Sequence, residues 1–138
     1  MPLPNISETV HGVSNIKEPW MTPVLAKTWD KLFNHLTQYD FSKVDRVMID
    51  TIRNDSAGLH YETTPGSESS TIVIGPYVFN LAWMTTPYTN KMIQSDIVLF
   101  VLLHEFAHHL QSTCQIETEE DREVQADEFA FQTIKEMR

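Results

Sequence analysis

The segment that decides the fold reads Ile-Val-Leu-Phe-Val-Leu-Leu-His-Glu-Phe-Ala-His and spans residues 97–108. Its first seven residues would be apolar on every side of a helix, which is typical of a buried helix. Because Ala107 and Leu110 continue the apolar spacing, the sequence predicts one helix from about Lys91 to Ser112. The segment ends in two histidines and a glutamate, which are costly to bury unless they are paired or bind a metal.

His104, Glu105 and His108 form an H-E-x-x-H pattern. Residues four apart lie on one face of a helix, about 5–6 Å apart at their β-carbons, so two imidazoles can converge on one zinc ion. Glu105 lies to one side of them, where it can take a proton from a zinc-activated water as the general base. The pattern predicts one zinc ion per chain. The alternative is a helix with surface histidines near its end.

A catalytic zinc site has three protein ligands and one open position. No histidine follows His109, so beyond the motif the third ligand has to be a carboxylate. A last helix is predicted from about Glu119 to Met137, with Thr118 as its N-cap and Asp121 completing a capping box. The candidate acids on or before this helix are Glu117, Glu119, Glu120, Asp121, Glu123, Asp127 and Glu128.

Two of these acids stand out by their position on the last helix. Glu123 and Asp127 are one turn apart on a face that otherwise carries small or apolar residues, Ala126, Ala130 and Ile134 among them. We therefore predict Glu123 as the third ligand. Asp127 is predicted to accept a hydrogen bond from the outer N–H of a ligating histidine and so fix its tautomer. The alternative is that both acids lie at the solvent edge of an amphipathic helix.

The H-E-x-x-H pattern at 104–108, followed by Glu-Val-Gln-Ala-Asp-Glu-Phe-Ala at 123–130, resembles the gluzincin metallopeptidases, most of all the compact ImmA/IrrE-type (minigluzincin-like) branch. The resemblance covers roughly the final third of the chain. It implies a zincin-like peptidase with the ligands, base and second acid named above, and a sheet whose edge strand binds extended peptide. Ala107 stands where the family frequently has glycine.

The rest of the chain predicts a single α+β domain over residues 1–138. Residues 1–19 contain three prolines and little periodicity, so we expect an extended or mobile arm there. Thr22-Pro23 is typical of a helix start. The apolar residues that follow it at helical spacing predict an amphipathic helix: Leu25, Trp29, Leu32, Phe33 and Leu36. Apolar and alternating segments within 44–52, 59–63 and 71–74 predict a small antiparallel or mixed sheet of about three strands.

The sequence leaves open which residue stabilises the oxyanion and which strand binds the substrate. A tetrahedral intermediate needs a hydrogen-bond donor besides zinc, often Tyr or His. Tyr77, Tyr88, His60 and His109 are the candidates, and they stay open. An extended peptide substrate is expected to pair with a sheet edge at Thr71–Gly75 or Tyr77–Asn80.

Composition limits the function classes. The chain has 138 residues with 19 acidic and 10 basic ones, a net charge of −9, which disfavours binding to nucleic acid or to an anionic membrane surface. One cysteine permits neither an internal disulfide nor a cysteine-rich zinc site. With no secretory signal and no apolar run long enough to span a bilayer, we expect a cytoplasmic protein.

The function predicted on these grounds is a zinc metalloendopeptidase. Two rivals belong to other classes. One is a catalytically quiet zinc-binding interaction module of the same fold, for which Glu105 would have no use. The other is a metal-free helical interaction protein, which would show no stoichiometric zinc and no stability change with a chelator.

Overall fold

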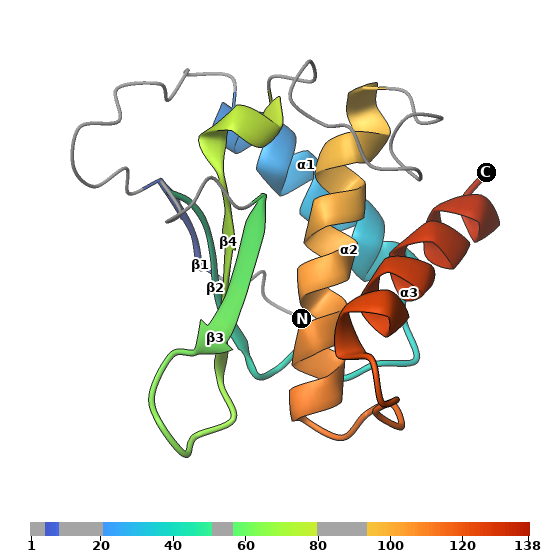
Figure 1. The fold of residues 1–138 in the computed structure, drawn as a ribbon. Helices are drawn as coiled ribbons and strands as arrows, with labels where there is room; N and C mark the ends of the chain where they lie inside the picture. The colour runs from blue at the N-terminus through green and yellow to red at the C-terminus, as the bar shows by residue number, and fades with distance from the viewer. Residues whose placement is uncertain (1–4, 9–20, 51–56, 80–93) are drawn as a thin grey trace.

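The computed structural model describes residues 5–8, 21–50, 57–79 and 94–138. The chain forms an α+β fold in which helices cover one face of a sheet (Figure 1). In chain order the elements are β1 (Asn5–Glu8), α1 (Met21–His35), β2 (Val44–Ile49), β3 (Gly58–Glu62), β4 (Ser70–Ile74), the 3-10 helix η2 (Pro76–Phe79), α2 (Gln94–Ser112) and α3 (Arg122–Glu136). The α+β prediction is confirmed.

The sheet has four strands in the order β1-β2-β4-β3. β1 and β4 run parallel to β2, whereas β3 runs antiparallel to β4. The prediction of about three strands therefore missed β1, which lies within the predicted extended arm. After β2 the chain forms β3 at the edge of the sheet. It then turns back as β4, which lies between β2 and β3, so the sheet contains both parallel and antiparallel pairs. Alternation within a strand carries no information about this order.

β3 is an edge of the sheet, and β4 is interior. The prediction that Thr71–Gly75 offers a free edge is therefore wrong, since β4 is paired on both sides. The alternative segment, Tyr77–Asn80, is not a strand in its described part, because Pro76–Phe79 forms a 3-10 helix. Pro76 has no N–H to donate to a ladder, which favours a turn after β4.

The core lies between the sheet and the helices. All seven residues from Ile97 to Leu103 are buried, as predicted for a helix that is apolar all round. α1 contributes the predicted stripe, in which Leu25, Trp29 and Leu32 are fully buried. An aromatic cluster joins α1 to α2, with Trp29 edge-on to Phe106 and Phe41 stacked on Phe106 at 4.6 Å between ring centroids. α2 thus packs against the sheet and against α1.

α3 begins later than predicted. Its N-cap is Asp121, whose Oδ1 accepts a hydrogen bond from the N–H of Val124 at 3.1 Å. The predicted start at Glu119 with Thr118 as N-cap is therefore wrong. The shorter Asp side chain at residue 121 caps the helix itself instead of completing a box, and this places Glu123 in the first turn.

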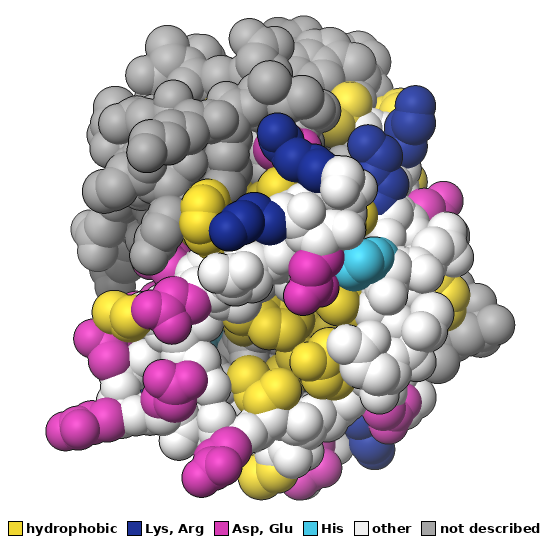
Figure 2. All heavy atoms as spheres, turned by 90° about the vertical axis from the view of Figure 1, so that its right-hand side faces the viewer, with side chains coloured by type: hydrophobic (Ala, Val, Ile, Leu, Met, Phe, Trp, Pro, Cys, Tyr) yellow, Lys and Arg dark blue, Asp and Glu magenta, His cyan; other side chains and the backbone are white. Residues whose placement is uncertain are grey.

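α3 packs along α2 and crosses the outer side of the molecule (Figure 1). Figure 2 shows this side with most Lys and Arg side chains near the top and Asp and Glu side chains mainly at the left and lower left. The first turn of α3 carries Glu123. Acidic side chains near a helix N-terminus interact favourably with the helix dipole. Among the helices in the described ranges, none is long and apolar enough to cross a membrane.

Candidate metal centre

Two histidines of α2 face the space between β3 and α3. His104 and His108 are one turn apart, with ring centroids 4.8 Å apart and planes nearly perpendicular. Their Nε2 atoms are separated by 3.2 Å. Both side chains are mostly buried, at 16% and 13% exposure. The expected convergence of the two imidazoles is present.

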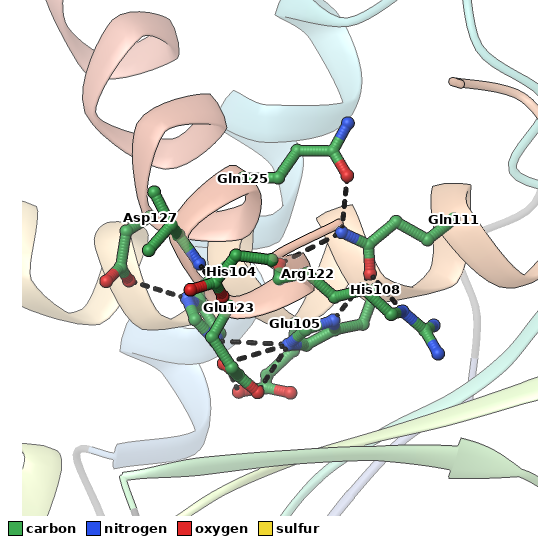
Figure 3. Close-up of polar contacts among 10 residues, drawn as sticks. His104, Glu105, His108, Gln111, Arg122, Glu123, Gln125 and Asp127 are labelled. Carbon is green, nitrogen blue, oxygen red and sulfur yellow. Dashed lines mark hydrogen bonds and ion pairs between the residues drawn. The ribbon is translucent and has the colours of Figure 1, made fainter. Parts of the chain in front are cut away.

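α3 brings a carboxylate to the same point (Figure 3). Glu123 Oε2 lies 2.9 Å from Nε2 of His104 and 3.3 Å from Nε2 of His108. Asp121, the N-cap, lies two residues before Glu123, so Glu123 is in the first turn of α3. Within the described residues, one group of His, Cys, Asp or Glu side chains could hold a metal ion: His104, His108 and Glu123, whose ligand atoms all lie within 4.8 Å of one another.

Asp127 fixes the tautomer of His104. Its Oδ1 lies 2.8 Å from Nδ1 of His104 (Figure 3). A carboxylate only accepts hydrogen bonds, so Nδ1 carries the proton and, in the neutral ring, Nε2 presents a lone pair. Burial by itself lowers the pKa of His104. The hydrogen bond to Asp127 and the charges of Glu105, Asp127 and Glu123 outweigh it, so that the pKa is raised on balance.

Gln111 fixes the tautomer of His108, a role that sequence reasoning missed. Its Nε2 donates to the carbonyl oxygen of Arg122 at 3.0 Å and to Oε1 of Gln125 at 2.8 Å. A carbonyl oxygen only accepts, so the amide nitrogen has to face Arg122. Gln111 Oε1 therefore faces Nδ1 of His108 at 2.8 Å, and that nitrogen carries the proton. A glutamine three residues after the second motif histidine, on the same helix face, was the available signal.

The residues present fit a zinc ion. With both Nδ1 atoms protonated, the two neutral imidazoles direct lone pairs from Nε2 atoms that are 3.2 Å apart. Two nitrogens bound to one tetrahedral zinc at about 2.0–2.1 Å stand about 3.3 Å apart. At this distance the two Nε2 atoms need a positive charge between them, either a proton on His104, whose pKa is raised, or a metal ion. The Glu123 carboxylate adds a third ligand atom. Two imidazole nitrogens and one carboxylate oxygen are a ligand set of catalytic zinc sites.

Glu105 lies beside these ligands without joining them. Its Oε2 is 3.9 Å from Nε2 of His104, and the side chain is 8% exposed. Burial raises the pKa of this carboxyl to about 7, an effect that the nearby charges of Glu123 and Asp127 reinforce and that of His104 opposes. A carboxyl whose pKa is near 7 is suited to exchanging protons at neutral pH.

A cavity of about 380 Å³ opens in front of the site. The edge strand forms one wall with Gly58, Leu59 and His60, preceded by Ala57. α2 adds Phe100, Val101, His104, Glu105 and His108, and α3 adds Glu123 and Asp127. The edge strand and the predicted site residues thus border the same space.

The other sequence candidates lie elsewhere. His109 is fully buried and hydrogen-bonds Ser70, so it is not a surface residue and does not line the cavity. The side chain of Tyr77 and all of Tyr88 lie outside the described residues. The remaining acids considered as ligands, Glu117, Glu119, Glu120, Asp121 and Glu128, are exposed and do not belong to the cluster. Cys114 follows the end of α2, is exposed, and does not belong to the cluster of possible metal ligands.

Comparisons of the chain with protein-family models, with curated proteins and with solved structures find no match.

Proposed function

We propose that the protein is a zinc-dependent endopeptidase of the gluzincin type with a zincin-like fold. The observation that carries this proposal is the convergence of the Nε2 lone pairs of His104 and His108 with the Glu123 carboxylate, beside a buried Glu105. A purely structural zinc site is normally closed by four protein ligands. Three ligand groups in front of a cavity instead leave a position for water or substrate.

A zinc ion held by these three residues would act as a Lewis acid and lower the pKa of a bound water to about 7. Glu105 is the chain's own proton acceptor. Its carboxyl lies beside the ligand atoms, with Oε2 3.9 Å from Nε2 of His104, within reach of a water bound at that position. Glu105 would take the proton from the attacking water and later deliver it to the leaving amine. Asp127 holds His104, and Gln111 holds His108, in the tautomer and orientation that zinc binding requires.

The proposed substrate is an extended segment of protein or peptide. β3 is the last strand of the sheet, and its residues line the cavity. An unpaired edge strand offers main-chain N–H and C=O groups to which an extended peptide can add as a further strand. A peptide paired with β3 would run past Glu105 and the metal ligands. This proposal moves the substrate strand from the two segments expected from sequence to β3.

The proposal is tested first by metal content. Purified wild type, His104→Ala and Glu123→Ala are dialysed and their zinc is measured by elemental analysis. We expect about one zinc per chain in the wild type and loss in both variants. Glu128→Ala is the matched control, because it removes an exposed acid of α3 outside the cluster and should keep its zinc.

Hydrolysis is tested with a library of internally quenched fluorescent peptides. Wild type should cleave a subset, and Glu105→Gln should abolish cleavage while zinc stays bound. Bound zinc with no cleavage would favour the quiet interaction module. No zinc in the wild type after zinc is added back would overturn the proposal and favour a metal-free interaction protein.

A further inference from the structure

Three polar side chains outside the ligand set form a hydrogen-bonded chain from the cavity into the core. Nε2 of His60, on β3, lies 2.7 Å from the hydroxyl oxygen of Ser70, on β4. The same oxygen lies 2.6 Å from Nδ1 of His109, on α2. Ser70 and His109 are fully buried, whereas His60 is half-buried and lines the cavity.

The single proton of the Ser70 hydroxyl allows two arrangements for neutral rings. In the first, Nδ1–H of His109 donates to Ser70, and the Ser70 hydroxyl donates to Nε2 of His60. The proton of His60 is then on Nδ1. In the second, Nε2–H of His60 donates to Ser70, and Ser70 donates to Nδ1 of His109. The proton of His109 is then on Nε2.

Burial of His109 favours the first arrangement. Its Nε2 is buried and has no hydrogen-bond partner in the described part of the chain. The second arrangement would place an N–H donor there, and unpaired buried N–H groups are rarer in proteins than unpaired acceptors. The first arrangement places only a lone pair at that position.

The cavity favours the same arrangement at the other end of the chain. Nδ1 of His60 makes no hydrogen bond to any described residue. The cavity that His60 lines also carries the carboxyl groups of Glu105, Glu123 and Asp127. Ser70 uses Nε2 of His60, so Nδ1 is the ring nitrogen left for a group in the cavity, and a proton there makes it a donor. Burial lowers the pKa of His60 to about 4, so its ring is neutral at pH 7.

His60 has no competitor among the described residues around the cavity. His104 and His108 use their nitrogens for the metal and for the groups that orient them. The remaining described lining residues are apolar or acidic, or are glycine, and none is Lys, Arg or Tyr. His60 also stands close to the ligands, with its ring centroid 6.5 Å from that of His108.

We propose that His60 is the neutral hydrogen-bond donor that stabilises the substrate carbonyl oxygen as negative charge develops on it, and that Ser70 and His109 are positioning residues that hold its proton on Nδ1. This rests on the proposed peptidase function. Ser70 and His109 act through His60. When Nδ1 of His109 donates to Ser70, the Ser70 hydroxyl donates to Nε2 of His60, so the proton of His60 is on Nδ1. A donor already oriented before the substrate arrives needs no reorganisation when charge develops.

The first experiment does not depend on hydrolysis. The ¹⁵N shifts of the histidine rings are measured by NMR in the zinc-loaded protein, with His60 assigned through His60→Asn. We expect Nδ1 of His60 to carry the proton, and we expect a mixture of tautomers in Ser70→Ala. A ring protonated on Nε2 in the wild type would overturn the proposal, whether or not the protein cleaves peptides.

The second experiment uses the best-cleaved peptide of the library. His60→Leu should lower kcat by about 10²-fold with little change in KM, because one oxyanion donor is lost. His60→Asn keeps an N–H near the position of Nδ1 and should recover part of that loss. Tyr61→Leu, on the exposed side of β3, is the control. Zinc content and thermal stability are measured for each variant, so that a loss of metal or of folding is recognised.

The outcomes separate this proposal from the peptidase assignment. Full kcat in a zinc-loaded, folded His60→Leu would overturn the role of His60 and leave the peptidase intact. No cleavage by the wild type would overturn the proposed function and, with it, the catalytic role of His60. The NMR result would then still decide the tautomer.

Discussion

Gly58 of β3 lies so close to Glu105 that a β-carbon at residue 58 would stand 2.8 Å from both Cγ and Oε2 of Glu105. The same β-carbon would stand 2.9 Å from Cγ1 of Val101. Non-bonded carbon atoms are at their optimal separation at about 3.5–4.0 Å, so such contacts force a shift. The missing side chain at residue 58 therefore allows the buried carboxyl to lie against the edge strand.

Gly58→Ala is expected to displace the Glu105 carboxyl and to lower kcat about 10²-fold, because a shift of about 1 Å in a catalytic group has an effect of that size. Zinc should stay bound, since no ligand is touched. Kinetics and elemental analysis of the variant check this, beside Tyr61→Ala as a control on the same strand. An unchanged kcat would show that the carboxyl tolerates the new methyl group.

The metal-free protein should show the cost of burying Glu105. Its pKa is raised from 4.5 to about 7. Between these values the folded chain keeps a proton that the unfolded chain has lost, so the free energy of unfolding falls as the pH rises through this window. In Glu105→Gln the amide does not titrate, so this dependence of the free energy of unfolding on pH is absent. Between pH 5 and pH 8, urea unfolding in EDTA should show the variant gaining about 2.5 kcal/mol relative to wild type. A constant difference would contradict the raised pKa.

Gln111→Leu is expected to weaken zinc binding by about 10–100-fold, because Nδ1 of His108 loses the acceptor that orients the ring. Competition with a chromophoric chelator measures the affinity, and circular dichroism verifies that the variant is folded. Gln132→Leu makes the same chemical change at an exposed position of α3 and should bind zinc like wild type. Equal affinities for all three proteins would remove Gln111 from the site.

Zinc should stabilise the folded chain, because only the folded state brings the three ligand groups together. Free zinc at 1,000 times its Kd adds about 4 kcal/mol to the free energy of unfolding, which for a chain of this size raises Tm by roughly 10–20 °C. Thermal melts with zinc and with EDTA measure the shift. His104→Ala should melt at the same temperature in both. A wild type insensitive to zinc would count against the site.

Local patterns predicted the helical part of the site well. The i, i+4 spacing placed His104 and His108 on one face, and the position of Glu123 and Asp127 on the last helix led to their contacts with α2. Helix periodicity is a local property, so a single segment is sufficient to recognise it. The start of α3 was misplaced by three residues because Thr118 and Asp121 are both acceptable caps.

The sheet and the buried polar contacts were harder to predict. Strand order depends on pairing between distant segments, which explains why β4 was taken for an edge and why β1 was missed. His109 was left open as an oxyanion candidate, but its side chain is fully buried and does not line the cavity. Its contact with Ser70 joins residues 39 positions apart, and no periodic pattern carries such a pairing.

The connection between α2 and α3 has an uncommon constraint. The side chain of Gln125 donates to the carbonyl oxygen of Glu117 at 2.7 Å and accepts from the N–H of Glu119 and from Gln111. The main chain of the connection is thus tied, through two amides, to the ring of His108. Surface loops commonly accept inserted residues, and the β3–β4 turn around Gly66 has no such tie to the ligands. An insertion near Glu117 would instead disturb the contacts that orient the ring of His108, so the candidate site depends on the length of this connection.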